Sequence, residues 1–198
     1  MNRVATLALA ACILFAPASR AGRSSAADAR RASGLRYFTD VELVNQYGRK
    51  MRLYSDLIEG KVVIIDGFFT SCAGACPVMN HNMERIQDWL GDRLGRDVSM
   101  ISISVDPLND TPDKLRAYAA RFHVRKGWYF LTGPKEKMDF ALRRLGQPLD
   151  AKENHTNIFV IGNETTGLWK KAFGLASAED LIRIVQSVLD DKPQDSAP

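Results

Sequence analysis

The chain has 198 residues, of which 25% are charged and 45% hydrophobic, with a formal net charge of +4 at pH 7. This composition is ordinary for a globular protein, and the length suffices for one domain with a hydrophobic core. No long run of Lys and Arg with interleaved aromatic side chains occurs, so the sequence gives little support to nucleic-acid binding.

Residues 1–21 have the pattern of an export signal. Arg3 provides a basic start, residues 4–18 are almost wholly apolar, and small residues around Ala21 offer a cleavage point. Because the apolar run is shorter than the roughly 20 residues that a membrane-spanning helix needs, we expect cleavage. The alternative is a retained anchor, with lipid attached to Cys12 in the segment LAAC.

Cleavage leaves an exported chain with two cysteines, Cys72 and Cys76. Residues 22–36 are small, polar and basic, which predicts a flexible linker. We expect the folded domain over residues 37–191 and a disordered tail over residues 192–198.

The domain begins with a predicted β-hairpin. Residues 40–45 alternate between polar and apolar side chains, turn at 46–48 and resume at 49–57, where a short helical turn follows. Residues 61–69, KVVIIDGFF, form a nearly continuous apolar run that predicts a central strand buried on both faces.

Helices and strands then alternate along the chain. Pro77 suits the first turn of a helix, and Thr111 followed by Pro112 is a specific helix start. The apolar face of the first helix is expected to carry Val78, Met83, Ile86, Leu90 and Leu94. The further elements are a strand over 98–105, a helix over 109–122, a strand over 127–133, a helix over 134–146, a hairpin over 157–174 and a helix over 178–189.

This order predicts an α/β, thioredoxin-like fold. A leading β-hairpin precedes a central mixed, mainly parallel sheet with helices on both faces. The cysteine pair falls in the loop that leaves the carboxyl end of the first central strand, where open α/β sheets place their functional sites.

Cys72 and Cys76, in the segment FFTSCAGACPVMNHN, can form a disulfide, a redox pair or part of a metal site. A structural disulfide closing so short a loop would stabilise the fold by only about 2 kcal/mol. Cys76 is expected just before a helix, whose N–H groups would lower the pKa of its thiol. The spacing differs from the C-x-x-C of thioredoxin-type oxidoreductases.

The three histidines differ in their prospects as a third ligand. His81 is expected to be a surface or helix-packing residue, and His123 to end an amphipathic helix, where a partly charged imidazole suits the helix dipole. His155 stands in a polar loop before the penultimate strand, which the predicted topology brings beside the cysteines.

Two thiolates and an imidazole suit copper better than zinc, which usually requires a fourth ligand in a structural site. Met79 and Met83 are also soft donors, but their helical spacing predicts packing in the core. Asp106 and Pro107 predict a turn, and Asp110 and Thr111 a helix cap, so these residues are left outside the site.

Three features together resemble bacterial members of the SCO/SenC family, exported factors for cytochrome c oxidase assembly. They are the segment CAGACP, the segment SVDPLNDTP, and the histidine before the penultimate strand; the likeness covers residues 38–174. The family often has an acidic residue directly before that histidine, whereas this chain has Asn154, with Glu153 one position earlier.

The resemblance implies a copper metallochaperone that binds Cu(I) or Cu(II) through Cys72, Cys76 and His155 and loads only when the cysteines are reduced. The implied acceptor is the CuA centre of cytochrome c oxidase subunit II, or another exported copper protein. The implied location is the periplasm or the extracytoplasmic side of the inner membrane, with a possible membrane tether, and we expect a monomer.

Two alternatives to the chaperone remain open. A thiol–disulfide oxidoreductase would use Cys72 as the exposed nucleophile with Cys76 as its partner, and would reduce the CuA-site cysteines of subunit II. A redox-sensing module would bind a partner according to the oxidation state of the pair.

Overall fold

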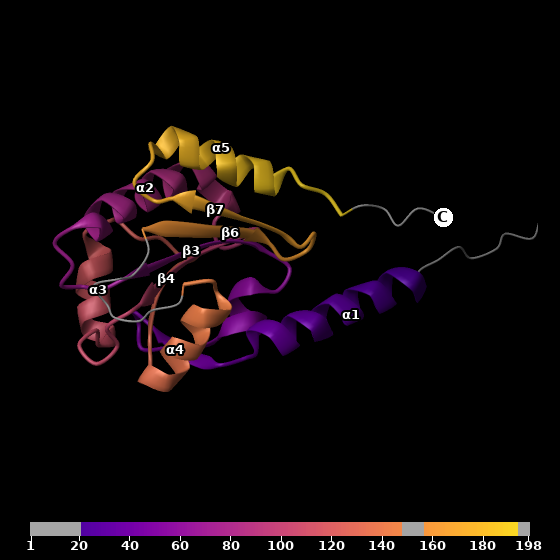
Figure 1. Ribbon diagram of the computed structural model, residues 1–198, viewed down its shortest axis with the longest axis horizontal. Helices are drawn as coiled ribbons and strands as arrows, with labels where there is room; N and C mark the ends of the chain where they lie inside the picture. Colours follow the sequence, from indigo (N-terminus) through magenta and orange to yellow (C-terminus); the bar gives the residue numbers. More distant parts are fainter. Residues whose placement is uncertain (1–20, 148–156, 194–198) are drawn as a thin grey trace, which may run out of the picture.

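The computed structural model of the protein describes residues 21–147 and 157–193. This part of the chain folds as a seven-stranded sheet between two layers of helices (Figure 1). Its elements are α1 (Ala21–Phe38), β1 (Glu42–Asn45), β2 (Lys50–Arg52), the π-helix η1 (Leu53–Ile58), β3 (Val62–Phe68), α2 (Ala75–Leu90), the 3₁₀ helix η2 (Gly91–Arg93), β4 (Val98–Ser104), α3 (Pro112–Ala120), β5 (Trp128–Thr132), α4 (Lys135–Arg144), β6 (Ile158–Asn163), β7 (Leu168–Phe173) and α5 (Ala178–Leu189).

The strands lie in the order β2-β1-β5-β4-β3-β6-β7. Strands β3, β4 and β5 are parallel, and every other pairing in this sheet is antiparallel. The predicted thioredoxin-like α/β fold with a mixed sheet and a leading hairpin is confirmed, but the prediction of a mainly parallel sheet is wrong. Only strands joined by the helical crossovers α2 and α3 run parallel, whereas the two hairpins add antiparallel strands on both sides.

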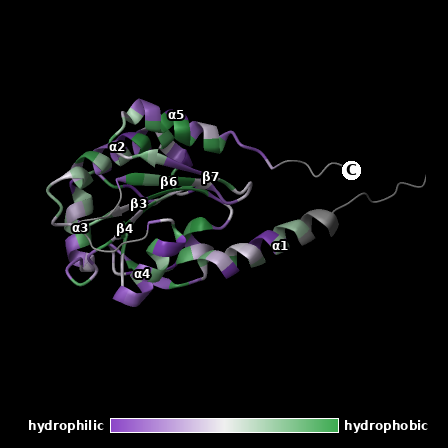
Figure 2. Ribbon diagram, in the orientation of Figure 1, coloured by the Kyte–Doolittle hydropathy of each residue, from purple (hydrophilic) through white to green (hydrophobic). Residues whose placement is uncertain are grey.

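Helices cover both faces of the sheet, as predicted. Helices α2, α3 and α5 pack on one face, where Ile64 of β3 shares a core cluster with Met83 and Leu181. Helices α1 and α4, with η1, pack on the other, where Ile65 shares a cluster with Leu142. In Figure 2 the packed helices alternate between hydrophobic and hydrophilic residues, as expected of helices with one buried face.

Local sequence signals account for the helix boundaries. The side chain of Thr111 accepts a hydrogen bond from the backbone N–H of Lys114 at the start of α3, and Ser177 does the same for Asp180 at the start of α5. The predicted apolar face of α2 is confirmed at the fully buried Met83, whereas Val78 is 51% exposed.

Helix α1 replaces the flexible linker predicted over residues 22–36. The segment is rich in Ala and Arg, which favour helix, and tertiary contacts hold it against η1. Arg31 forms an ion pair with Glu59, and the ring of Phe38 stacks 6.3 Å from that of Tyr54. The disordered tail is predicted over residues 192–198, of which residues 194–198 lie outside the described residues. Among the residues that the structure describes, no helix is long and apolar enough to cross a membrane.

We expect the substitution Gly34→Ala to destabilise the fold, although alanine is the better helix former by about 1 kcal/mol. A Cβ at this position would overlap the ring of Tyr54, which is fully buried and donates its hydroxyl hydrogen to Glu164. Overpacking of this kind costs about 1–3 kcal/mol. Urea denaturation measures the change, and Ser33→Ala on the exposed face is the matched control, for which no loss is expected.

Candidate functional site

The cysteine loop joins the carboxyl end of β3 to the start of α2. Strand β3 ends at Phe68, and Gly74 precedes the first helical residue, Ala75. Gly74 is the N-cap residue of α2, and a Cβ at this position would meet nothing within 4 Å. Cys72 lies in the loop, whereas Cys76 lies in the first turn of α2 rather than before the helix as predicted.

The two thiols are in contact without forming a disulfide. Neither Cys72 nor Cys76 is in a disulfide, and their side chains are hydrogen-bonded to each other. Cys72 is half-buried, whereas Cys76 is 1% exposed and belongs to the core cluster beneath α2. The loop therefore presents one accessible sulfur and holds the second just below the surface.

Burial raises the pKa of Cys76 well above its ordinary value, and the hydrogen bond with Cys72 raises it further. A hydrogen bond with the backbone of Phe69 partly offsets this rise, and the charge of Asp66 adds to it. The predicted lowering of the pKa is wrong, because desolvation of a buried thiolate outweighs the partial positive charge of the helix N-terminus. Cys76 is thus a neutral thiol, and a bound metal must displace its proton.

Asp66 is a buried carboxyl group that the sequence analysis did not include in the site. It stands in β3 with no exposed surface, and burial raises its pKa to about 7. Ser102 donates a hydrogen bond to Asp66 Oδ1 at 2.6 Å, and the indole N–H of Trp128 donates to the Ser102 hydroxyl oxygen at 2.9 Å. The signal for Asp66 was visible as the single charged residue inside the apolar strand VVIIDGF.

A second buried carboxylate, Asp110, contacts the cysteine loop from the side. The sequence predicts that Asp110 and Thr111 together cap a helix, but the structure gives the capping role to Thr111 alone. Asp110 instead accepts hydrogen bonds from Thr70, two residues before Cys72, and from Ser104 at the end of β4. Asp110 therefore makes a contact between distant segments that its position before a helix does not reveal.

His81 and His123 are both exposed, and His81 also packs on a neighbouring ring, in agreement with the predicted surface or helix-packing role. Their Nδ1 atoms lie 3.2 Å and 2.6 Å from the carboxylate oxygens of Glu84. The ring edge of His81 also packs against Phe122, with ring centroids 5.1 Å apart. Met79 and Met83, considered as soft donors, are fully buried in the core and confirm the packing role.

The predicted ligand His155 lies outside the described residues, together with Glu153 and Asn154. The described strand β6, which begins at Ile158, runs antiparallel to β3 with Val160 opposite Ile65. This register places the start of β6 at the edge of the sheet where β3 ends and the cysteine loop begins. Within residues 21–147 and 157–193, no group of three His, Cys, Asp or Glu side chains could hold a metal ion.

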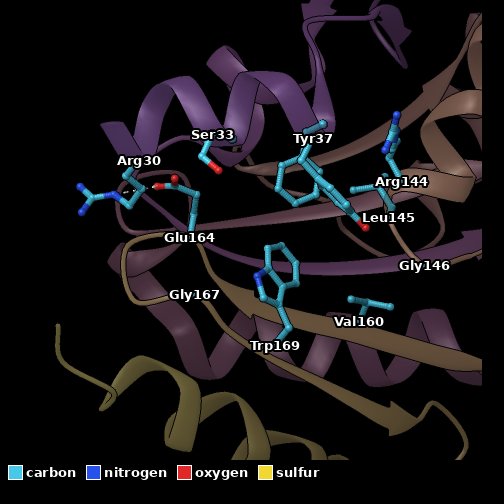
Figure 3. Close-up of a pocket in the computed structure, with 12 residues that line it drawn as sticks. Arg30, Ser33, Tyr37, Arg144, Leu145, Gly146, Val160, Glu164, Gly167 and Trp169 are labelled. Carbon is cyan, nitrogen blue, oxygen red and sulfur yellow. Dashed lines mark ion pairs between the residues drawn. The ribbon is translucent and has the colours of Figure 1, made fainter. Parts of the chain in front are cut away.

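A pocket of about 490 Å³ lies on the other face of the sheet, between α1, the end of α4 and strands β6 and β7. Figure 3 shows Tyr37 and Trp169 facing each other across it, with Arg144 at one end and the ion pair of Arg30 and Glu164 at the other. Neither cysteine lines this pocket, so it is separate from the cysteine site.

Comparison with known proteins identifies the family. A family model described as SCO1/SenC matches residues 30–190. The chain belongs to the SCO1/SenC family. This membership confirms the resemblance drawn from the two motifs and the histidine.

Two relatives show how much of this chain resembles known proteins. An SCO1 protein homolog of Bacillus subtilis is 39% identical over 102 residues, which cover 50% of this chain and 51% of that protein. A proposed copper-binding protein of Stutzerimonas stutzeri is 28% identical over 132 residues, which cover 67% of this chain and 58% of that protein. The chain thus spans about half to three fifths of the length of these two relatives.

Solved SCO structures share the fold. BsSco, described as a cytochrome c oxidase assembly protein with a disulfide switch, is 31% identical with a TM-score of 0.62, covering 76% of this chain and 92% of its own. An SCO1/SenC family lipoprotein from Bacillus anthracis is 28% identical with a TM-score of 0.63, covering 75% and 92%. Copper-bound yeast Sco1 is 20% identical with a TM-score of 0.63, covering 79% of this chain and 94% of its own. At this identity, the likeness supports only the shared fold.

We expect iodoacetamide to modify Cys72 well before Cys76 in the reduced, metal-free protein. Cys72 is accessible, whereas Cys76 is 1% exposed and its pKa is raised by burial. Mass spectrometry of peptides after short reaction times measures the order. In urea both thiols should react at similar rates, and preferential labelling of Cys76 in the folded protein would contradict the described site.

We expect Asp66→Asn to remove a pH dependence of stability. The folded carboxyl, with a pKa of about 7, retains a proton that the unfolded chain releases above its ordinary pKa of 3.8. Stability therefore falls as pH rises between these two values, by at most about 4 kcal/mol. Urea denaturation at pH 5 and pH 8 measures the effect. Relative to the unsubstituted protein, the variant should be more stable at pH 8 than it is at pH 5. If the difference in unfolding free energy between the two proteins is the same at both pH values, the assignment is refuted.

Proposed function

We propose that this protein is a copper metallochaperone that binds copper through Cys72, Cys76 and His155. The observation that carries the proposal is the contact between two reduced thiols at the edge of the sheet where β6 also begins. His155 precedes the first residue of β6 by three positions, which supports its assignment as the third ligand.

The chemistry of the donors supports copper as the cargo. Thiolates are soft ligands that favour Cu(I), and mixed thiolate and imidazole sets also suit Cu(II). The copper-binding description of the Stutzerimonas stutzeri relative agrees with this choice. BsSco is described as belonging to a family of cytochrome c oxidase assembly proteins, which supports the CuA centre of oxidase subunit II as the acceptor.

The redox state of the cysteines controls loading in this proposal. Oxidation of the pair to a disulfide releases two protons and two electrons and leaves no thiolate to bind the metal. In the reduced state, the accessible Cys72 provides the side from which a ligand of the acceptor can approach. Copper then moves by exchange of ligands, without being released into water.

The cellular location follows from the same proposal. Residues 1–21 would direct export to the periplasm, by cleavage or through a lipid anchor on Cys12. The description of the Bacillus anthracis relative as a lipoprotein supports a form held at the extracytoplasmic side of the membrane. We expect the folded domain to act as a monomer.

A second function, thiol–disulfide exchange, is favoured by the contact between the accessible Cys72 and the buried Cys76. In this alternative, the Cys72 thiolate attacks a disulfide between the CuA-site cysteines of subunit II, forming a mixed disulfide and releasing one subunit II thiolate. Cys76 then gives up its proton and attacks the Cys72 sulfur, which forms the Cys72–Cys76 disulfide and releases the second subunit II thiolate. The disulfide switch described for BsSco supports redox chemistry at such a pair.

We expect reduced protein to bind one copper ion, and Cys72→Ser, Cys76→Ser and His155→Ala each to weaken binding, because each removes one donor. Copper titration followed by absorption measures this, and Cu(II) should give an intense thiolate-to-copper charge-transfer band that the His155 variant alters. His123→Ala is the matched control, because this imidazole is exposed and paired with Glu84.

Unchanged copper affinity in His155→Ala would contradict the proposed ligand set. If the metal-free protein reduces a subunit II disulfide catalytically, and the His155→Ala variant does so equally well, the oxidoreductase function is established instead.

A further inference from the structure

Asp110 connects the cysteine loop to the end of the neighbouring strand. Its carboxylate is 1% exposed and accepts a hydrogen bond from the backbone N–H of Thr70 at 3.2 Å. The hydroxyl of Thr70 donates to the same oxygen, and the hydroxyl of Ser104 donates to the other oxygen at 2.6 Å. Three donors from two distant segments therefore converge on one buried group.

The segment that carries Asp110 is itself well anchored. The backbone N–H groups of Asn109 and Asp110 both donate to the carbonyl oxygen of Asp106, which forms a tight turn. The backbone N–H of Asp106 donates to the hydroxyl of Ser104, the last residue of β4, and Thr111 caps α3 directly afterwards. Asp110 is thus held by a strand end on one side and a helix start on the other.

The segment that Asp110 contacts is the one that positions the accessible sulfur. Thr70 precedes Cys72 by two residues, and the backbone N–H of Cys72 donates to the carbonyl of Phe69 at 3.1 Å. Because Asp110 binds both the backbone and the side chain of Thr70, it restricts the path of the chain between the end of β3 and Cys72.

A carboxylate suits this position better than an amide. An ionised carboxylate only accepts hydrogen bonds and can satisfy the three donors that face it. An asparagine would place an NH₂ group against one or more of those donors, and a buried donor left without an acceptor is costly. The choice of Asp over Asn at a position of nearly the same size is therefore explained by the contacts it makes.

We propose that Asp110 is a positioning residue for the cysteine pair: by holding Thr70 it sets the place of the Cys72 sulfur relative to that of Cys76. Two equilibria depend on this spacing, disulfide formation and metal binding. The part concerning copper rests on the proposed function, whereas the part concerning the disulfide does not.

The test measures both equilibria in Asp110→Asn. Glutathione disulfide oxidises the pair, and each turnover forms one protein disulfide and two glutathione thiols, which receive the two protons. A less restricted Cys72 lowers the equilibrium constant for this reaction; a tenfold loss corresponds to a reduction potential higher by about 30 mV. Loss of such an orienting contact typically lowers metal affinity about 10–100-fold, which we expect for copper.

Matched variants separate positioning from charge and from stability. Asp113→Asn removes the same charge three residues further on, where the carboxylate is exposed and paired with Arg116, and should leave both equilibria unchanged. Thr70→Val removes the hydroxyl from the other end of the contact and should shift both equilibria in the same direction as Asp110→Asn. Thr70→Ser keeps the hydroxyl, so both equilibria should match those of the unsubstituted protein.

Circular dichroism at each condition confirms that the variants are folded, so that an equilibrium shift is not an unfolding effect. The double variant of Asp110→Asn and Thr70→Val should be less impaired than the sum of the single effects, because both remove one contact. If Asp110→Asn does not fold, Thr70→Val and Thr70→Ser carry the comparison.

The inference is overturned if the variants lose stability toward urea while the glutathione equilibrium stays unchanged, because Asp110 would then support the fold alone. If the glutathione equilibrium shifts as expected but the unsubstituted protein binds no copper, the positioning role stands and the proposed function fails.

Discussion

The site depends on the pairing of β3 with a parallel strand on one side and an antiparallel strand on the other. Strand β3 is buried along its whole length between β4 and β6. The parallel partner ends at the same edge as β3, and the antiparallel partner begins there. Chain segments far apart in the sequence thus meet at one edge, where the cysteine loop leaves the sheet.

Burial then gives the two cysteines different properties. Cys76 belongs to the hydrophobic core, so its thiol is neutral and shielded, whereas Cys72 is half-buried in a loop against the same core. Two buried aspartates accompany the pair: Asp66 in β3, whose charge adds a small part to the rise that burial causes in the pKa of Cys76, and Asp110, which binds Thr70 in the loop. The core therefore influences both the protonation and the geometry of the site.

The sequence was sufficient for the order of the elements, because buried strands, helix periodicity and caps such as Thr111 and Ser177 are local signals. It failed where tertiary contacts decide the outcome. Helix α1 is polar, and its place depends on contacts such as that of Phe38 with Tyr54. The pKa of Cys76 depends on burial that spacing alone does not reveal, and the role of Asp110 depends on a residue 40 positions away.

The central claim is that two sulfurs and one imidazole nitrogen bind a single copper ion. X-ray absorption spectroscopy of the protein loaded with one equivalent of Cu(I) tests this most directly. The account predicts two sulfur ligands and one imidazole ligand, with the imidazole contribution absent from the His155→Ala protein. A spectrum with sulfur ligands alone, or with scattering between two copper ions in a cluster, would contradict it.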